Sequence, residues 1–381
     1  MKPLKYISQN MIELINGKII KQESLQMNIV TKAIKSVKHC ALLEGLLYIM
    51  RNNAKMAFLN YLKTQEANGE SGTIVIIKLW CFIRSSDPEC CEEDDPTYFQ
   101  IDVQLRKQNE VYSESSYSES YNDLSVKIER LLNQLNRYFK HEFATFEQKY
   151  LCNNLCFREK AAAIMIHEYA HLFEADIYLH SRKYIDKINP SIKLEDLWTH
   201  DEIPKFCYGI DDELVPCENY VILKNGTLDS IIVDKKWSNI YHTVPRGNGR
   251  IAFENNAIIM PRMRISKISF DESVAICDQN LTNDKELLFH SIKSAKLYPK
   301  DGMVLMRIAD AEYISKHERI RFKPFDIKVN IFEIVNNIFA ASKDNYNMVY
   351  PCGKNGIQLP CGVITPMKFY SIKGENNVLL L

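Results

Sequence analysis

The sequence predicts an α+β fold, with an N-terminal α+β domain over residues 1–150 and a β-rich C-terminal domain over residues 151–381 that contains a metal-binding helix. The first observation is length, because 381 residues exceed what one hydrophobic core usually holds. The second is the order of the elements. Helical and strand patterns are mixed in the first half, whereas short apolar runs separated by turn signals fill most of the second. Segregated elements of this kind favour α+β over an alternating α/β sheet.

Composition and charge exclude several classes of protein. The 48 Lys and Arg residues balance the 48 Asp and Glu residues, so we expect no nucleic-acid partner and no attraction to an anionic membrane. The N-terminus has no apolar segment of signal-peptide length, and the longest apolar run, 73–83, is far shorter than the roughly 20 residues that cross a bilayer. Eleven cysteines, an odd number, fit reduced thiols. We therefore expect a cytoplasmic protein without a membrane anchor.

In the first half, hydrophobic periodicity predicts a helix near residues 25–38. The β-branched and aromatic run 72–83 predicts a buried strand, and we expect 100–105 to pair with it in the same sheet. Residues 107–123 are rich in Ser, Glu and Tyr and predict a loop or linker. A helix with one apolar face follows from Asp123.

The second half opens with a segment whose Ala, Met, Leu and Glu content predicts one long helix over about residues 158–179. Turn signals and short apolar runs follow. Asn225-Gly226 lies between two of these runs in 220–234 and predicts a hairpin with a tight turn. We expect the rest of this half to be mostly antiparallel.

The helix carries the motif His167-Glu168-Tyr-Ala-His171. Residues four apart lie on one helix face, so the two imidazoles can bind one ion while Glu168 holds a water beside them. A zinc ion lowers the pKa of bound water to about 7, and a neighbouring glutamate can accept its proton. The motif therefore predicts a zinc hydrolase with Glu168 as the general base.

A catalytic zinc usually has a third protein ligand and one open position. Glu195 lies at roughly the downstream distance seen in thermolysin-like enzymes, without their flanking pattern. Cys352 is the other candidate, in a short turn expected to expose its thiol, where Lys354 would favour the thiolate. The residues alone leave this choice open.

Five motifs in order carry a resemblance to a known family. They are Tyr208-Gly-Ile-Asp-Asp-Glu-Leu-Val-Pro216, Val221-Ile-Leu-Lys-Asn-Gly-Thr-Leu228, Arg246-Gly-Asn-Gly-Arg250, Met260-Pro-Arg-Met263 and Cys352-Gly-Lys-Asn-Gly-Ile-Gln-Leu-Pro360. Together they make residues 160–370 resemble the TldD/PmbA metallopeptidases. The first 150 residues resemble the family only faintly.

The resemblance implies a zinc ion held by His167, His171 and Cys352, with Glu168 as general base. The family helix reads H-E-x-x-x-H, whereas this chain has one residue fewer between its histidines. Glu174 and Asp176 match the acidic residues that follow the family motif. Glu174 either orients the His171 imidazole or is a solvated helix carboxylate.

Arg250, in the Gly247-Asn-Gly-Arg250 run, either binds a peptide carboxylate or belongs to a turn between strands.

The predicted function is hydrolysis of short or unfolded peptides, which in the family include peptide-antibiotic precursors and leader peptides. The resemblance also implies a homodimer, or a heterodimer with a TldE-like homologue. Two alternatives are a catalytically silent TldE-like subunit that completes a partner's chamber, and an unrelated zinc peptidase that uses Glu195.

Overall fold

The computed structural model describes residues 6–28, 33–36, 41–67, 73–85, 97–107, 110–118, 121–140, 143–201, 203, 209–251, 259–277, 285–354, 357–372 and 378–380. Tyr208, Asn355 and Gly356 of the motifs above lie outside these residues, as do 29–32 and 37–38 of the expected first helix. The chain divides into two compact units. The first comprises Met1–Glu142, Ile251–Ile258 and Gly353–Ile357, and the second comprises the rest. The domain boundary expected after residue 150 stays a prediction.

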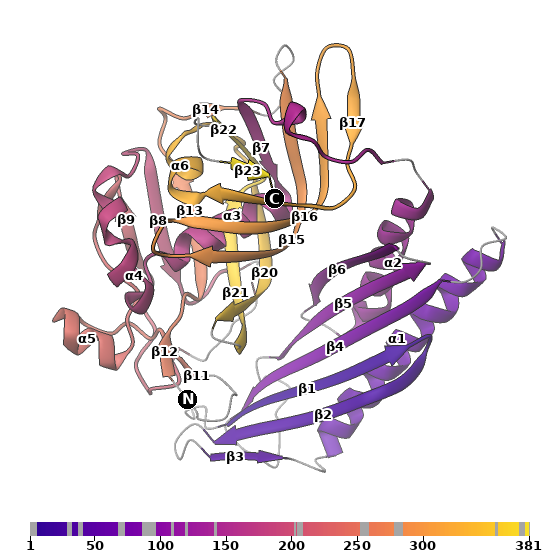
Figure 1. The fold of residues 1–381 in the computed structure, drawn as a ribbon. Coiled ribbons are helices and arrows are strands. Elements are labelled where there is room, and N and C mark those ends of the chain that lie inside the picture. The colour runs from indigo at the N-terminus through magenta and orange to yellow at the C-terminus, as the bar shows by residue number, and fades with distance from the viewer. Residues whose placement is uncertain are drawn as a thin grey trace. The chain divides into compact units, whose positions relative to one another are not determined.

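The first unit is a six-stranded antiparallel sheet with two helices on one face (Figure 1). Its strands, in the order β3-β2-β1-β4-β5-β6, are β3 (Ala33–Ser36), β2 (Lys18–Asn28), β1 (Tyr6–Ile15), β4 (Ile74–Ser85), β5 (Thr97–Lys107) and β6 (Glu110–Ser118). The helices are α1 (Ala41–Ala67) and α2 (Leu124–Lys140), with the short η1 (Tyr121–Asp123) before α2. The predicted strand 72–83, its pairing with 100–105 and the helix after Asp123 are confirmed.

The helix predicted near 25–38 is wrong. Residues 18–28 form β2 and residues 33–36 form β3, which pair with each other in antiparallel register. A two-residue turn at Asn16-Gly17, with φ of 48° and 74°, reverses the chain so that β2 pairs with β1 along its whole length. Because β1 in turn pairs with β4, sheet hydrogen bonding outweighs the helical spacing of the apolar residues.

The loop predicted over 107–123 is also wrong, because residues 110–118 form the edge strand β6. An edge strand needs only alternate residues to face the core. Tyr112 provides such a contact, since it is buried and stacks on Tyr138 of α2 with ring centroids 4.9 Å apart. The Ser-rich composition hid this alternation.

The second unit contains two larger sheets and a two-stranded one. One sheet has the strand order β14-β19-β22-β7-β15-β16-β18-β23, and β17 also pairs with β16. The bounds of these strands are β14 (Ala275–Ile276), β19 (Ile338–Ala341), β22 (Lys368–Ile372), β7 (Asn154–Arg158), β15 (Glu286–Tyr298), β16 (Met303–Ile314), β17 (Arg319–Arg321), β18 (Phe325–Asn330) and β23 (Val378–Leu380). The other runs β10-β9-β8-β13-β21-β20, with β10 (Thr227–Leu228), β9 (Tyr220–Lys224), β8 (Ile192–Leu197), β13 (Ile265–Phe270), β21 (Ile357–Pro366) and β20 (Asn345–Lys354). The small sheet pairs β11 (Gly249–Ile251) with β12 (Ile259–Pro261).

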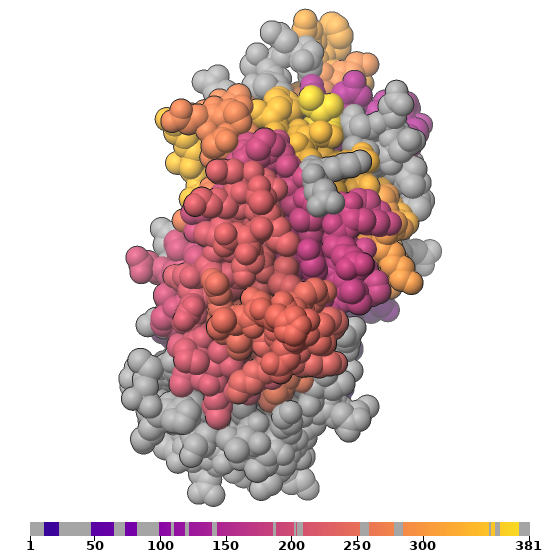
Figure 2. Space-filling view, turned by 90° about the vertical axis from the view of Figure 1, so that its left-hand side faces the viewer, coloured from indigo at the N-terminus to yellow at the C-terminus, as the bar shows by residue number. Residues whose placement is uncertain are grey.

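Helix α3 (Glu159–His171) contacts strands of both large sheets, including β15 and β7 of one and β13 of the other. The remaining helices are α4 (Ala175–Ser181), α5 (Lys235–Tyr241), α6 (Ile331–Asn336), η2 (Gln148–Tyr150) and η3 (Arg182–Lys187). Figure 2 shows one face of this unit, where the chain from α4 to α5 forms much of the described surface. Every residue from Ala161 to His171 is buried, which places the motif helix in the core.

The expected α+β class is confirmed, and most strand pairs of the second unit are antiparallel. The predicted hairpin is also present, as β9 and β10 joined by Asn225-Gly226. Both turn residues have positive φ, and a Cβ on Gly226 would lie 2.8 Å from the Ile188 carbonyl oxygen, so this position requires glycine. Among the described residues, no helix is long and apolar enough to cross a membrane.

Candidate metal centre

The two motif histidines lie one turn apart on α3, as their spacing predicts. His167 is fully buried and His171 is 5% exposed. Their rings meet nearly at right angles, with centroids 4.8 Å apart. Ala161, Ala162 and Ala163 occupy the preceding turn and are all buried, so small side chains let the strands pack close to the helix. Helix α3 continues without a break between the two histidines, so the shorter histidine spacing is compatible with a regular helix here.

The single long helix predicted over 158–179 is wrong, because α3 ends at His171 and the separate helix α4 begins at Ala175. The N–H groups of Leu172 and Phe173 close a tight final turn, and Glu174 then adopts an extended backbone with φ −71° and ψ 127°. Residues 173 and 175 form backbone hydrogen bonds with Ile232 instead of continuing the helix. Strand-like pairing with a distant segment thus overrides a helix-favouring sequence.

This break turns the Glu174 side chain back toward the histidines. Glu174 Oε2 lies 2.7 Å from His171 Nδ1, and its Oε1 accepts a hydrogen bond of 2.9 Å from the backbone N–H of Met263. The carboxylate is fully buried, so it is not a solvated helix carboxylate. A proton on Nδ1 leaves His171 Nε2 available as a ligand atom.

Cys352 completes the group from β20. Its Sγ lies 2.9 Å from His171 Nε2, and the ligand atoms of His167, His171 and Cys352 all lie within 4.8 Å of one another. The expectation that a turn exposes this thiol is wrong, because Cys352 is a strand residue only 1% exposed. The second unit thus brings together residues 181 positions apart in the sequence.

The charges around Cys352 favour the thiolate. Burial alone raises the pKa of this thiol, but hydrogen bonding with Cys361 and the positive charges of Arg262 and His171 hold the pKa well below its usual value. Burial lowers the pKa of His171, whereas Cys352 and Glu174 raise it, to about 10 in the metal-free protein. The two pKa shifts favour an imidazolium–thiolate pair in the metal-free protein.

Glu168 lies on the same helix and is 5% exposed. Burial raises the pKa of its carboxyl group, and the neighbouring His171 and His167 oppose that rise. A raised carboxyl pKa brings a general base closer to the pH at which it works. Glu168 does not belong to the three-ligand group found among the described residues. Its carboxylate is therefore available for proton transfer.

The donor set fits a zinc ion. One thiolate and two imidazoles are common zinc ligands and leave a fourth tetrahedral position open. Zinc–nitrogen distances of about 2.0–2.1 Å and a zinc–sulfur distance of about 2.3 Å place nitrogen and sulfur ligands roughly 3.5 Å apart. The 2.9 Å between Cys352 Sγ and His171 Nε2 would have to lengthen by a fraction of an ångström, since a hydrogen bond now joins these atoms.

Residues 152–370, more than half of the chain, match the family described as the PmbA/TldA metallopeptidase C-terminal domain. The chain belongs to the PmbA/TldD family. This match shows that the five motifs are not coincidental, so the hypothesis of an unrelated zinc peptidase is wrong. No curated protein matches the chain.

Solved structures with the same fold span nearly the whole chain. TldE from Thermococcus kodakarensis has a TM-score of 0.59 and 14% identity, with 98% of this chain and 97% of that one covered. A protein from Thermotoga maritima described as a candidate modulator of a DNA gyrase has a TM-score of 0.58 and 12% identity, with coverage of 99% and 95%. A protein from Bacteroides thetaiotaomicron with a similar description has a TM-score of 0.51 and 12% identity, with coverage of 97% and 94%. These likenesses concern the fold alone.

In this PmbA/TldD-family chain, two other candidates of the sequence lie on strands β8 and β11. Glu195, on β8, forms an ion pair of 2.9 Å with Lys193 and is not in the three-ligand group. Arg250, expected in a loop or turn, lies in β11 and is only 2% exposed. The substrate role considered for Arg250 stays a prediction.

Sequence reasoning missed Arg262, which is fully buried next to the cluster. Its Nη2 donates a 2.8 Å hydrogen bond to the Cys352 carbonyl oxygen, and its Nε lies 3.9 Å from Glu174 Oε1. The signal was present in Met260-Pro-Arg-Met263, because an arginine inside an apolar run has to find buried partners.

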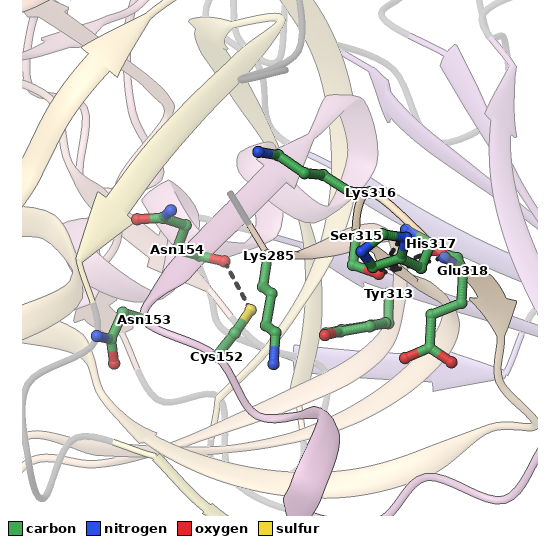
Figure 3. Close-up of a pocket in the computed structure, with 9 residues that line it drawn as sticks. All are labelled: Cys152, Asn153, Asn154, Lys285, Tyr313, Ser315, Lys316, His317 and Glu318. Carbon is green, nitrogen blue, oxygen red and sulfur yellow. Dashed lines mark hydrogen bonds between the residues drawn. The ribbon is translucent and has the colours of Figure 1, made fainter. Parts of the chain in front are cut away.

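A separate hollow of about 890 Å³ lies in the same unit, where the β16–β17 hairpin passes the start of β7 (Figure 3). Its lining residues are Cys152, Asn153, Asn154, Lys285, Tyr313, Ser315, Lys316, His317 and Glu318. The Cys152 thiol donates a hydrogen bond of 3.3 Å to the Asn154 carbonyl oxygen. Burial raises the pKa of Cys152 to about 11, so this thiol is protonated at neutral pH and is a poor nucleophile or metal ligand.

Proposed function

We propose that this chain is a zinc-dependent peptidase that hydrolyses short or unfolded peptides. The observation that carries the proposal is the buried group of His167, His171 and Cys352, with Glu168 on the same helix. In this proposal His167 Nδ1 or Nε2, His171 Nε2 and Cys352 Sγ hold the ion. When bound, zinc would activate a water molecule and polarise the scissile carbonyl group.

The chain's own residues then have separate roles. Glu168 accepts a proton from the attacking water and passes it to the leaving amine. Glu174 holds the Nδ1 proton of His171, which keeps Nε2 directed at the metal position. The closely packed core around α3 keeps the ligands from rearranging.

The Glu168→Gln variant tests this assignment. The amide is nearly isosteric but cannot accept the proton, so we expect the zinc content to be retained and turnover to fall by about 10² to 10⁴. Peptide hydrolysis and zinc per chain should be measured on the same samples. Glu159→Gln, at the exposed start of the same helix, is the matched control and should change neither.

Loss of zinc from Glu168→Gln would contradict the assignment, since it would make Glu168 a ligand. Unchanged turnover in that variant would also contradict it, and would attribute any hydrolysis to another protein in the sample.

A second candidate function is a silent subunit that completes the chamber of a homologous partner. The likeness to TldE of Thermococcus kodakarensis favours it. Retention of the buried His-His-Cys group in this chain supports the peptidase instead. Assays of the zinc-loaded chain, alone and together with a TldE-like homologue, decide between them. Glu168→Gln would lower hydrolysis if this chain is the peptidase, whereas it would leave hydrolysis unchanged if this chain is the silent subunit.

We also propose that the chain acts in the cytoplasm as a homodimer or as a heterodimer with a TldE-like homologue, on substrates such as peptide-antibiotic precursors or leader peptides. Light scattering of the active protein tests the oligomeric part. A mass of 44.3 kDa with full peptidase activity would contradict it.

A further inference from the structure

Arg262 is one of the largest fully buried side chains among the described residues. It lies between β12 and β13 of the second unit, in a short segment that belongs to neither strand. Arginine is rarely fully buried unless its charge is matched and its N–H groups have acceptors. Its contacts therefore indicate what the guanidinium does.

Those contacts lead to two parts of the metal cluster. One is the cysteine arm, Cys352 on β20, and the other is the histidine arm, His171 on α3. Nη2 donates to the carbonyl oxygen of Cys352 at 2.8 Å, which holds the cysteine arm through its backbone. Nε faces Glu174 Oε1 at 3.9 Å, and Glu174 in turn contacts His171 Nδ1 at 2.7 Å. The adjacent Met263 N–H also donates to Glu174 Oε1, at 2.9 Å. One two-residue segment thus connects the cysteine arm to the histidine arm.

We propose that Arg262 is a positioning residue that fixes the Cys352 arm relative to the His171 arm and thereby sets the affinity of the site for zinc. The inference rests on the proposed function, because it assumes that these residues bind the metal. Residues that orient ligands typically change metal affinity by 10- to 100-fold when they are replaced.

Two physical effects support this role. The ligands come from α3 and β20, which are distant in sequence, so their spacing depends on tertiary contacts rather than on helix geometry. The planar guanidinium of Arg262 donates a hydrogen bond to the Cys352 carbonyl oxygen while it forms an ion pair with Glu174 at 3.9 Å, a distance too long for a hydrogen bond. A lysine ammonium on a flexible chain is less well organised to make both contacts at once. The positive charge of Arg262 also offsets the buried charges of Glu174 and the Cys352 thiolate.

Arg264 provides a matched control, because it is the same residue type two positions on and is only 1% exposed. It bonds to Asp196 Oδ2 at 2.7 Å and to the carbonyl oxygens of Arg246 and Glu218, but to none of the proposed ligands. Its replacement by lysine perturbs a buried ion pair of similar kind without touching the metal arms.

The experiment compares wild type, Arg262→Lys, Arg262→Met and Arg264→Lys as full-length chains. Zinc affinity is measured by competition with a chromophoric chelator, and the thiolate-to-metal charge-transfer band is recorded after loading with cobalt(II). We expect Arg262→Lys to bind zinc about 10- to 100-fold more weakly than wild type and Arg262→Met more weakly still. We expect a changed cobalt band in both, while Arg264→Lys matches wild type in affinity and band.

Wild-type zinc affinity and cobalt spectrum in Arg262→Lys would overturn the inference and leave the proposed function intact. Equal weakening in Arg262→Lys and Arg264→Lys would also overturn it, since the effect would then be general damage to the core. A wild-type chain that binds no zinc would overturn the proposed function and this inference together. If Arg262→Met does not fold, Arg262→Lys decides, because it keeps the buried positive charge.

Discussion

Two cysteines of the second unit, Cys352 and Cys152, have opposite chemistry. Cys352 is the more deeply buried, and burial alone would make its thiol inert. Arg262 and His171 reverse that effect and hold its pKa well below the usual value, whereas burial is the largest influence on Cys152 and raises its pKa to about 11. The comparison indicates that charged and hydrogen-bonding groups facing a buried cysteine can outweigh the effect of burial on its pKa.

The largest expected effect separates the two cysteines directly. Cys352→Ser should lose most of its zinc at neutral pH, because a serine hydroxyl stays protonated where the thiol is ionised. Cys152→Ser should keep its zinc, since Cys152 is not in the three-ligand group. Elemental analysis of both purified variants gives zinc per chain.

The same measurement on Glu195→Ala completes this test. Full zinc content in Cys352→Ser together with zinc loss in Glu195→Ala would contradict the proposed ligand set. Glu195 would then be the third ligand. We expect Glu195→Ala to keep its zinc, because its carboxylate is paired with Lys193 on β8.

A smaller effect should come from Glu174→Gln, which leaves all three proposed ligands in place. The Glu174 carboxylate faces two N–H donors, on His171 and Met263. An amide has only one acceptor oxygen, so either the Met263 N–H loses its partner or the His171 proton moves to Nε2 and blocks metal binding. We expect zinc affinity about 10- to 100-fold weaker by chelator competition.

Glu195→Gln is the matched control for this variant and should bind zinc like the wild type. If Glu174→Gln also binds zinc like the wild type, the His171–Glu174 contact has no part in holding the metal. The zinc affinity then depends on the three proposed ligands without this contact.

Local sequence signals predicted the parts of the fold whose cause is local. Asn225-Gly226 marked its hairpin because both turn positions require positive φ. The same Asn-Gly dipeptide occurs at residues 16–17, so the β1–β2 hairpin could have been predicted in the same way. The histidine pair was predictable for a similar reason, since residues four apart on a helix always share a face.

The rest of the site depends on contacts between distant segments. The chain breaks before Glu174 because it pairs with Ile232, which no pattern near residue 174 records. Cys352 is positioned by a sheet whose strands come from all parts of the second unit, and family resemblance rather than spacing indicated it. The role we propose for Arg262 could be seen only once Cys352 and Glu174 had been placed beside it.

The smallest expected effect concerns the stability of the metal-free protein. The folded-state pKa of His171, about 10, is raised from 6.5, so the stability it contributes is complete below pH 6.5 and is lost as pH rises toward 10. The folded-state pKa of Cys352 is lowered from 9.0, so its contribution is complete above pH 9 and is lost as pH falls. Between pH 6.5 and 9, His171 and Cys352 together bind the same number of protons in the folded state as in the unfolded state. Their opposite effects on stability therefore cancel in this range.

We therefore expect a plateau between about pH 6.5 and 9 in the stability that the pair contributes, with a decline of up to about 1.4 kcal/mol per pH unit on either side. The measurement is the free energy of unfolding of metal-free wild type minus that of the double variant His171→Gln/Cys352→Ser, in which neither group titrates. The pH dependence of stability in Cys152→Ser should match wild type in the lower part of the plateau, up to about pH 8, because the Cys152 thiol is protonated there in both the folded and the unfolded state. A steady fall in stability with rising pH through the plateau region would mean that only His171 has a shifted pKa, and a steady rise would mean that only Cys352 has one. With a steady rise, the environment of Cys352 would stabilise the thiolate without the His171 imidazolium, and the cation that matters most would be Arg262.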